Sequence, residues 1–407
     1  MSILSKNFTF IDLFAGIGGF HYAMNKLSEE SQCVFASEID KNAIKIYELN
    51  HKIKCGQDIR KVDPNQIPNF EVVCGGFPCQ PFSKAGYQNG FSDERGNLFF
   101  EITKIISSKI LAGFKPKLIV LENVRNLATH DSKNTWETIR NELDKLGYNI
   151  IDYPIIVSPA DFNVPQLRDR AIILAVDRDI YSKPLEFKVK KTVSNKTIYE
   201  VLDNLTNDNL EDYRINEYEE KVLEAWDHFI KNLKIQTIGF PIWSDEFGLD
   251  YEIDHLPKWK QDFINKNRSL YKDNKKMIDE WKIKFNVASF IKTHRKFEWQ
   301  ASTKINSVFE GIIQFRPSGV RVKKPDFAPT LVAMAHVPII GKYRRYITPN
   351  EAAKLQSIPE GFDFDSVGKD IYRLLGNAVN VDVIYNVTKQ FIDYIDEKRG
   401  EMNENRI

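Results

Sequence analysis

One cysteine in this chain stands in a setting that favours nucleophilic chemistry. Cys79 lies in the segment 75–83, which reads GGFPCQPFS and directly follows the apolar run 72–74. The run is typical of a buried strand, and the two glycines and two prolines predict a rigid, non-helical loop after it. Ligands of open α/β sheets bind at the carboxyl ends of strands, so this thiol could attack a bound molecule. A partly buried structural cysteine is the alternative, because free cysteine often behaves as a small hydrophobe.

Four polar side chains could serve chemistry at the same edge of the predicted sheet. Glu122 directly follows the apolar run 117–121, which predicts a second buried strand. Its carboxylate would lie beside the cysteine loop if the strand order is conventional. Farther along, Gln166, Arg168 and Arg170 alternate, and alternate residues of an extended segment point to one side. Two guanidinium groups on one side suit phosphates or a carbonyl oxygen, with salt bridges to nearby aspartates as the alternative.

The beginning of the chain predicts a nucleotide-binding unit. A β-branched and aromatic run, 8–14, is followed by a glycine turn at 15–19 and by helical spacing over 20–27. This order is typical of βαβ units, in which glycines allow close backbone approach to a ligand. A second short strand, 33–36, leads to Glu38, about 20 positions after the glycines. An acidic residue at this distance could bind a ribose diol.

Further acids in this part of the chain bear on the identity of the cofactor. Asp40 could line the pocket or be the N-cap of a helix over 41–49. Asp58 follows a short strand predicted at 53–55, and could accept a hydrogen bond from an adenine amino group or start a turn. The pattern permits NAD, FAD or S-adenosylmethionine. No basic residue near the glycines could bind a pyrophosphate, whereas a positively charged sulfonium tolerates an acidic lining that includes Asp12, so S-adenosylmethionine is favoured.

The following patterns extend the predicted sheet. Helices are expected over 97–110 and 135–146, and strands over 150–157 and 171–176. Between the cysteine and the first of these helices, the glycine-containing stretch 81–96 predicts a mobile lid. An ordinary surface loop is the alternative for this stretch.

After about residue 178 the alternation of strands and helices stops, and charge separates into two blocks. Residues 200–254 contain four Lys or Arg against fifteen Asp or Glu, and residues 256–304 contain thirteen against five. The basic block also contains ring-bearing side chains, among them Trp259, Tyr271, Trp281, Phe285, Phe290, His294, Phe297 and Trp299. This mixture fits nucleic-acid binding and base stacking, and helical faces covered by solvated lysines are the alternative. Regular patterning resumes after the segment 315–321.

The C-terminal part shows two helix signals. Thr348 and Glu351 match a capping box, with Pro349 at the first helical position. An apolar helix is expected after Asn380 and should end near Tyr394.

Composition excludes several classes of protein. The 407 residues, with 42% hydrophobic and 28% charged side chains, are typical of a soluble globular chain with one or two domains. A net charge of +1 gives no global attraction to nucleic acid, so any basic surface must be local. The four cysteines, Cys33, Cys55, Cys74 and Cys79, match no disulfide framework or zinc site, which indicates a cytosolic protein without a metal. No apolar run approaches the ~20 residues that span a bilayer, so no membrane association is expected.

Six blocks of this sequence resemble the DNA cytosine-5 methyltransferases, and they occur in that family's order. They are the cofactor loop at 10–20, the catalytic loop at 75–83, the glutamate motif at 122–124, the arginine motif at 166–170 and two closing motifs at 345–359 and 376–379. The blocks cover residues 1–178 and about 311–395. The charge-separated middle falls where the family has its variable target recognition region.

The resemblance implies an α/β fold: the Rossmann-like sheet of S-adenosylmethionine-dependent methyltransferases, with helices on both faces, and a smaller irregular target-recognition domain. It implies a catalytic site in which Cys79 attacks C6 of cytosine, Glu122 donates to N3, and Arg168 and Arg170 contact O2 and a neighbouring phosphate. The cofactor-binding residues that it implies are Phe14, Gly16, Gly18, Glu38, Ile39, Asp58, Ile59, Asn377 and Val379. The C-terminal part must then return to the first domain, which gives domains of 1–178 completed by 326–407, and 179–325.

The implied function is methyl transfer from S-adenosylmethionine to C5 of a flipped-out cytosine in a specific double-stranded DNA sequence. The short chain suggests a bacterial, cytoplasmic, monomeric modification enzyme that is paired in function with a restriction endonuclease. The alternatives are an RNA (tRNA) cytosine-5 methyltransferase of the same fold, a non-catalytic DNA-binding relative and a nicotinamide oxidoreductase. The Pro-Cys-Gln loop and the large middle region favour DNA, and the presence of Cys79 and Glu122 favours catalysis. The recognised DNA sequence is not predicted.

Overall fold

A computed structural model describes residues 2–78, 98–192, 196–203, 211–233, 238–331 and 336–404. The chain divides into two compact units, one formed by Met1–Asn195 with Ala353–Ile407 and the other by Lys196–Ala352. The domain boundaries expected from the sequence, after residues 178 and 325, both fall earlier in the chain than these divisions. The expected boundaries stay a prediction.

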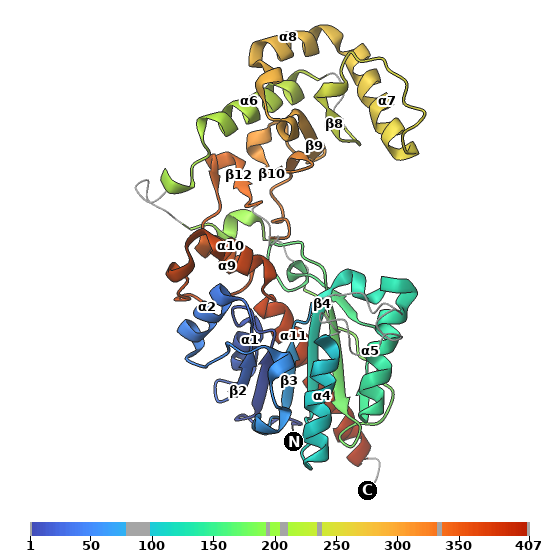
Figure 1. Cartoon of the computed structure of the whole chain (residues 1–407), viewed down its shortest axis with the longest axis vertical. Helices are drawn as coiled ribbons and strands as arrows, with labels where there is room; N and C mark the ends of the chain where they lie inside the picture. Colours follow the sequence, from blue (N-terminus) through green and yellow to red (C-terminus); the bar gives the residue numbers. More distant parts are fainter. Residues whose placement is uncertain are drawn as a thin grey trace. The chain divides into compact units, whose positions relative to one another are not determined.

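Within the described residues, the first unit is built on a seven-stranded sheet (Figure 1). The strand order is β2-β1-β3-β4-β7-β5, and β6 pairs with β7. The strands are β1 (Thr9–Leu13), β2 (Gln32–Ser37), β3 (Val72–Gly75), β4 (Leu118–Val124), β5 (Tyr148–Ile150), β6 (Ile155–Val157) and β7 (Arg170–Asp177). β1 to β4 pair in parallel, whereas β7 is antiparallel to β4, β5 and β6. β3 therefore lies between β1 and β4, as the conventional order requires.

Helices cover both faces of this sheet, as predicted; Figure 1 shows α4 in front of it and α11 behind. The helices of the unit are α1 (Gly19–Leu27), α2 (Lys41–His51), α4 (Leu98–Leu111), α5 (Asn134–Lys145), α10 (Ile371–Asn377) and α11 (Val381–Glu404). α1 packs against α11, and α4 packs against α5. The central strands β1, β3, β4 and β7 are almost entirely buried because they are covered on both sides.

Two strand predictions were wrong. The stretch 53–55 is a loop: Lys52 ends α2 in the left-handed region at φ 59°, and the Cys55 carbonyl accepts hydrogen bonds from two backbone N–H groups. The stretch 150–157 forms two strands, β5 and β6, because Pro154 between them has no N–H for a ladder.

The C-terminal helix is longer than predicted. α11 runs to Glu404 rather than ending near Tyr394, and the fully buried Ile395 continues its apolar face. α9 (Pro349–Leu355) begins as predicted: the backbone N–H of Glu351 donates to Oγ1 of Thr348 at 3.1 Å, and that of Thr348 donates to Oε2 of Glu351 at 2.8 Å.

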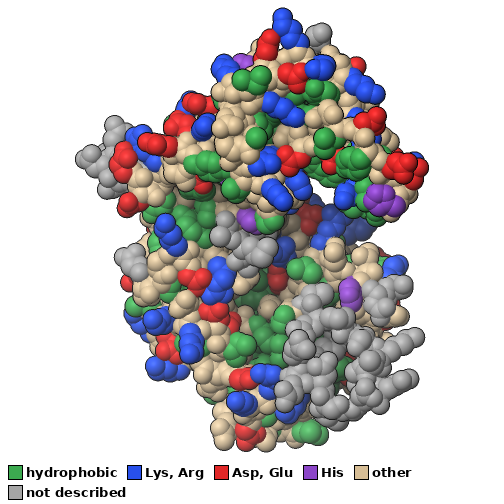
Figure 2. All heavy atoms as spheres, turned by 45° about the horizontal axis from the view of Figure 1, so that its top comes forward, with side chains coloured by type: hydrophobic (Ala, Val, Ile, Leu, Met, Phe, Trp, Pro, Cys, Tyr) green, Lys and Arg blue, Asp and Glu red, His purple; other side chains and the backbone are tan. Residues whose placement is uncertain are grey.

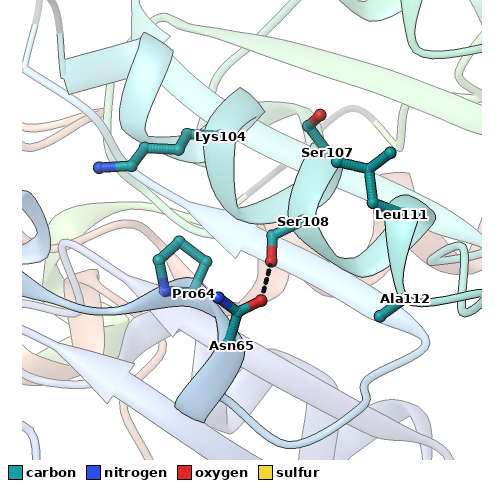
Figure 3. Close-up of a pocket in the computed structure, with 7 residues that line it drawn as sticks. All are labelled: Pro64, Asn65, Lys104, Ser107, Ser108, Leu111 and Ala112. Carbon is teal, nitrogen blue, oxygen red and sulfur yellow. Dashed lines mark hydrogen bonds between the residues drawn. The ribbon is translucent and has the colours of Figure 1, made fainter.

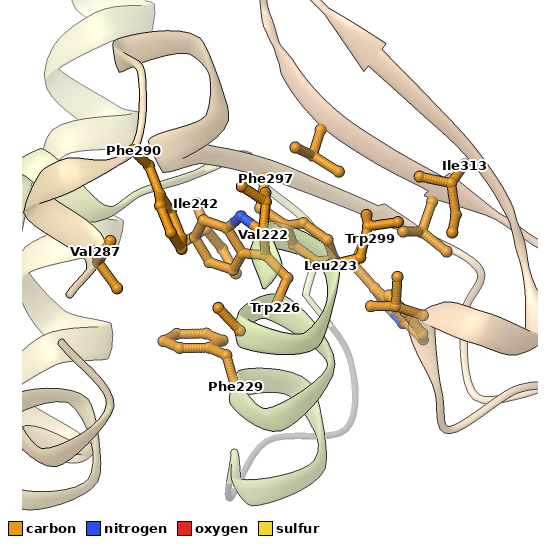
Figure 4. Close-up of a cluster of buried hydrophobic side chains, with 14 of the residues drawn as sticks. Val222, Leu223, Trp226, Phe229, Ile242, Val287, Phe290, Phe297, Trp299 and Ile313 are labelled. Carbon is orange, nitrogen blue, oxygen red and sulfur yellow. The ribbon is translucent and has the colours of Figure 1, made fainter. Parts of the chain in front are cut away.

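The second unit has its own sheet and core, which sequence patterning did not indicate. Among the described residues its strand order is β13-β12-β10-β11-β9-β8. The strands are β8 (Ile242–Trp243), β9 (Lys296–Gln300), β10 (Ile312–Arg316), β11 (Gly319–Lys323), β12 (Ile339–Ile340) and β13 (Arg345–Tyr346), and the helices are α6 (Glu217–Asn232), α7 (Lys258–Asp273) and α8 (Lys275–Phe285). Figure 4 shows the core, in which the ring of Trp226 stacks on Phe297 with a centroid separation of 4.7 Å.

The base-stacking interpretation of the basic block was wrong for four of its aromatic residues. Trp281, Phe290, Phe297 and Trp299 are at most 6% exposed and belong to the core of the second unit. Most lysines on α7 and α8 are exposed, as the alternative interpretation holds. Trp259, at 58% exposed, is an exception.

Candidate functional site

Glu122 and Arg170 face one another from neighbouring antiparallel strands of the first unit. Glu122 lies within β4 rather than after it, and Arg170 begins β7. Nε of Arg170 lies 2.7 Å from Oε1 of Glu122, and both side chains are mostly buried. Burial raises the pKa of Glu122, although Arg170 and then Arg168 act in the opposite direction. The net upward shift of the pKa favours the protonated carboxyl, which could donate a hydrogen bond.

Arg168 is buried and binds the C-terminal segment. Its Nη2 donates to the backbone oxygen of Ala378 at 2.9 Å, and its backbone N–H donates to Oγ of Ser158 at 2.8 Å. Burial, and then the nearby Arg170, lower the pKa of Arg168 to about 9, so it still carries a proton at neutral pH. Arg168 therefore connects the arginine motif with a segment 210 positions later in the chain.

The other members of the arginine motif have different partners. Oε1 of Gln166 accepts from Nε2 of Gln356 at 3.2 Å, in a fully buried contact with the C-terminal segment. The aspartates considered as alternative partners pair elsewhere: Asp169 lies 2.7 Å from Arg125 and Asp161 lies 2.9 Å from Lys191.

Cys79 and the expected lid at 81–96 lie outside the described residues. The chain just before Cys79 is fixed beside the carboxylate, because Nδ2 of Asn123 donates to the backbone oxygen of Phe77 at 2.8 Å. A Cβ on Gly76 would lie 3.8 Å from Oε2 of Glu122. Sequence reasoning assigned no role to Asn123, although a polar residue at the end of an apolar strand was a usable signal.

The glycine turn after β1 is held by Glu38. Oε2 of Glu38 accepts from the backbone N–H of Gly16 at 2.8 Å, while Oε1 accepts from the N–H groups of Ile39 and Asp40. Phe14, Gly16 and Gly18 all have positive φ, at 56°, 55° and 90°. This turn exposes backbone to an approaching ligand, as the predicted nucleotide-binding loop requires.

The acids near the turn differ in what they offer a ligand. A carboxylate has about four lone-pair sites, so Oε2 of Glu38 can still accept from a ribose hydroxyl. Asp40 caps α2 and pairs with Arg373 at 2.8 Å, which lowers the pKa of Asp40. Asp58 caps a short helical turn, and its pKa is lowered by its hydrogen bond to Arg60. Asp12 does not form part of the acidic lining, because it is fully buried and burial raises its pKa well above the usual range.

The remaining predicted cofactor-binding residues fit an adenosine-like group in part. Ile39 is 67% exposed beside Glu38 and offers an apolar surface, whereas the side chain of Ile59 is buried and only its backbone could contact a ligand. Asn377 ends α10 with an exposed side chain. Val379 packs on the glycine turn so closely that a Cβ on Gly19 would lie 2.6 Å from its Cγ2. The segment Ala378-Val379 thus contacts both the arginine motif and the glycine turn.

Other candidate sites are weaker. A surface pocket of about 550 Å³ lies between α4 and the turn at Pro64 (Figure 3), and none of its lining residues is a predicted site residue. Among the described residues, no group of three His, Cys, Asp or Glu side chains could hold a metal ion. Every helix that the structure describes is too short or too polar to cross a bilayer.

The chain is similar to known proteins over most of its length. A family model described as C-5 cytosine-specific DNA methylase matches residues 8–393. The chain is 34% identical to the Type II methyltransferase M.HgiCI of Herpetosiphon aurantiacus, over 92% of this chain and 95% of that protein. It is 32% identical to the Type II methyltransferase M.BanI of Aneurinibacillus aneurinilyticus, over 97% of this chain and 98% of that protein.

Solved structures have the same fold. A putative DNA modification methyltransferase encoded within an E. coli prophage superposes with a TM-score of 0.57 at 20% identity, over 96% of this chain and 99% of that one. The S. pombe Dnmt2 methyltransferase gives a TM-score of 0.53 at 21% identity, over 95% and 99% of the two chains.

Proposed function

Because the chain belongs to the C-5 cytosine-specific DNA methylase family, we propose that it transfers a methyl group from S-adenosylmethionine to C5 of one cytosine in a specific double-stranded DNA sequence. The observation that carries the proposal is the buried Glu122–Arg170 pair, placed beside the backbone that leads to Cys79. A carboxyl with a raised pKa next to an arginine, at the carboxyl edge of a sheet, suits a pyrimidine whose ring must take up electrons.

The proposed chemistry follows from the weak nucleophilicity of cytosine C5. The thiolate of Cys79 adds to C6, which moves an electron pair toward C5 while Glu122 donates a hydrogen bond or proton to N3. S-adenosylmethionine, when bound, supplies an electrophilic methyl group. C5 takes that methyl group as S-adenosylhomocysteine leaves. A base then removes the C5 proton, and the electrons of the broken C5–H bond re-form the C5=C6 double bond and expel the Cys79 thiolate. The base that removes this proton is not assigned.

The two arginines have different proposed roles. Arg170 contacts O2 of the cytosine, because its guanidinium lies against Glu122 at the sheet edge. Arg168 acts through the Ala378 carbonyl as a positioning residue, and its charge helps to keep Cys79 ionised. Glu38 accepts a hydrogen bond from the ribose, and the backbone of Phe14, Gly16 and Gly18 borders the methionine portion.

The pocket for the rest of the cofactor is formed by both ends of the first unit. Ile39 packs on the adenine, Asp58 and the backbone of Ile59 border its edge, and Asn377 with Val379 closes the pocket. The acidic side chains suit a sulfonium cation, and Asp58 stays ionised because Arg60 lowers its pKa.

The target base must leave the duplex, because C6 is inaccessible within the base stack. We propose that residues 81–96 close over the flipped base. The relatives named as Type II methyltransferases support a function paired with a restriction endonuclease, in which methylation protects the DNA of a bacterial cytoplasm. The enzyme is proposed to act as a monomer.

Covalent trapping tests this proposal directly. Duplex DNA carrying 5-fluorocytosine at the target position cannot lose a proton from C5, so an attacking enzyme remains attached. The wild type and the control Cys33→Ser should form a covalent adduct that depends on S-adenosylmethionine, whereas Cys79→Ser should form none. An adduct that persists in Cys79→Ser, or that is lost in Cys33→Ser, would contradict the assignment of the nucleophile.

A further inference from the structure

The sheet of the second unit has one apolar face and one face that carries charged side chains. Along β9, β10 and β11, alternate residues such as Phe297, Ile313 and Val322 enter the core. The intervening residues lie on the opposite face. Glu298, Arg321, Arg316 and Lys323 belong to this second set and are defined here as the charged cluster; Arg321 is directly paired with Glu298 in the β9–β11 register.

Arg321 is held in one orientation by Glu298. Nε and Nη2 of Arg321 lie 2.8 and 2.7 Å from Oε2 of Glu298. The same oxygen is 3.5 Å from Nη1 of Arg316, and Oε1 of Glu298 accepts from Oγ of Ser318 at 3.4 Å. The side chain of Arg321 is 21% exposed. A guanidinium held at one edge by a half-buried carboxylate, on a strand inside a sheet, has little freedom to rotate.

The charged cluster has more positive than negative charge. Glu298 is its one carboxylate, and among the described residues no acid forms an ion pair with Lys323. Burial and the neighbouring Arg321 lower the pKa of Arg316, and burial with both arginines lowers the pKa of Lys323. Like charges brought together in this way destabilise the free protein, so a ligand rich in acceptor atoms would relieve them.

Surface charge alone would not reveal this cluster. On the face of the molecule in Figure 2, Lys and Arg side chains are interspersed with Asp and Glu side chains over much of the surface. The distinguishing feature is the fixed guanidinium, not the density of positive charge.

We propose that Arg321, oriented by Glu298, reads a guanine of the target sequence in the major groove, with Arg316 and Lys323 contacting the flanking DNA backbone. Glu298 occupies the Nε–Nη2 edge of Arg321, and among the described residues Nη1 has no hydrogen bond or ion pair. The remaining Nη1–Nη2 edge matches the O6 and N7 acceptors of guanine. A base contact needs a fixed guanidinium plane, whereas a phosphate can be bound by a mobile side chain.

This inference depends on the proposed function, and one set of variants tests both separately. The wild-type target is first read by bisulfite sequencing of DNA from cells that express the full chain. Arg321→Ala is then compared with Arg214→Ala, which removes an exposed Arg–Glu pair of the same unit. Both are assayed on duplexes that carry every single-base-pair change of the target.

Arg321→Ala should lose about 10- to 100-fold of discrimination at one G·C pair and retain discrimination at the other positions. Arg321→Lys, which keeps the charge but not the fork, should show the same loss, and Glu298→Gln a smaller loss at the same position. Arg214→Ala should match the wild type. Thermal melting identifies any variant that does not fold. If Arg321→Ala does not fold, Arg321→Lys and Glu298→Gln provide the test instead.

Two results would overturn this inference alone. Uniformly weaker binding to all sequences, with a salt dependence reduced by about one phosphate contact, would assign Arg321 to the DNA backbone. Unchanged discrimination in Arg321→Ala and Arg321→Lys would remove Arg321 from recognition altogether. By contrast, absence of 5-methylcytosine in DNA exposed to the wild type would refute the proposed function itself.

Discussion

Nη2 of Arg168 donates a buried hydrogen bond to the backbone oxygen of Ala378, across 210 positions of sequence. Ala378 is followed by Val379, which packs on the glycine turn at Gly19. One side chain therefore connects the proposed base-binding residues with the proposed cofactor pocket. Both parts belong to the first unit, which is completed only when the C-terminal segment returns to it.

Breaking this connection should weaken cofactor binding as well as stability. In Arg168→Met the Ala378 carbonyl loses its donor, which should lower the free energy of unfolding by about 1.5–3 kcal/mol. We expect the KM for S-adenosylmethionine to rise several-fold more than the KM for DNA. Steady-state kinetics and urea unfolding measure both quantities.

Arg125→Ala is the matched control for this prediction. It removes the exposed Arg125–Asp169 pair near the same motif, and exposed pairs contribute about 1 kcal/mol or less. If the two variants changed the KM for S-adenosylmethionine equally, Arg168 would not connect the two sites.

Glu122→Gln should remove catalysis while leaving the strand in place. Glutamine can still accept from Arg170, but it cannot present the protonated carboxyl that the raised pKa favours. The kcat should fall about 10²- to 10⁴-fold. In the wild type, the protonated form is lost as pH rises through the raised folded pKa, so kcat should decline on the alkaline side. A Glu122→Gln variant that retained kcat and the alkaline decline would disprove this role.

Two glycines of the turn should respond differently to the same substitution. A Cβ on Gly18 would lie 1.9 Å from Nε2 of His51, whereas a Cβ on Gly16 meets no atom within 4 Å. Both residues have positive φ, which disfavours alanine by about 1–2 kcal/mol. Gly18→Ala should therefore lower the melting temperature clearly more than Gly16→Ala. Gly16→Ala should mainly weaken S-adenosylmethionine binding, measured by calorimetry; equal melting temperatures would contradict this packing.

Two stacked histidines under the turn should make the fold sensitive to acid. The rings of His21 and His51 lie 4.0 Å apart, and burial lowers their pKa values to about 3 and about 4. The unfolded chain takes up protons below about pH 6.5, while the folded state stays neutral until its lower pKa values. Stability is therefore unaffected above pH 6.5 and falls as pH decreases toward 4, by about 2 kcal/mol for each histidine at pH 5.

Urea unfolding at pH 7 and pH 5 measures this effect. His51→Gln should reduce the difference between the two pH values, whereas the exposed His255→Gln should leave it unchanged. An identical pH dependence in all three proteins would show that the buried histidines do not cause the loss.

Local patterns predicted the nucleotide-binding part of the fold well. The runs before and after the glycine turn became β1 and α1, and the capping box at Thr348 formed as expected. Short apolar stretches were less reliable, because 53–55 has the composition of a strand but does not join the sheet. Strand pairing is decided by tertiary structure.

Contacts between distant segments could not be derived from spacing. The two arginines occupy equivalent positions in the sequence pattern, yet Arg168 binds Ala378 and Arg170 binds Glu122. The contact of Arg168 depends on how the C-terminal segment returns to the first unit. The aromatic residues of the basic block, such as Trp281 and Phe297, entered a core whose sheet was not predicted. Charge and aromatic content alone do not distinguish a stacking surface from a core.

The most direct test of the central claim is to identify the product and its nucleic acid. The purified protein, S-adenosylmethionine and either duplex DNA or tRNA are incubated, and the nucleosides are then separated and identified by mass spectrometry. We predict 5-methyldeoxycytidine in the DNA, at one fixed sequence context, and no methylation of the tRNA. Methylation of tRNA without DNA, or a methyl group on a nitrogen of cytosine, would contradict the account.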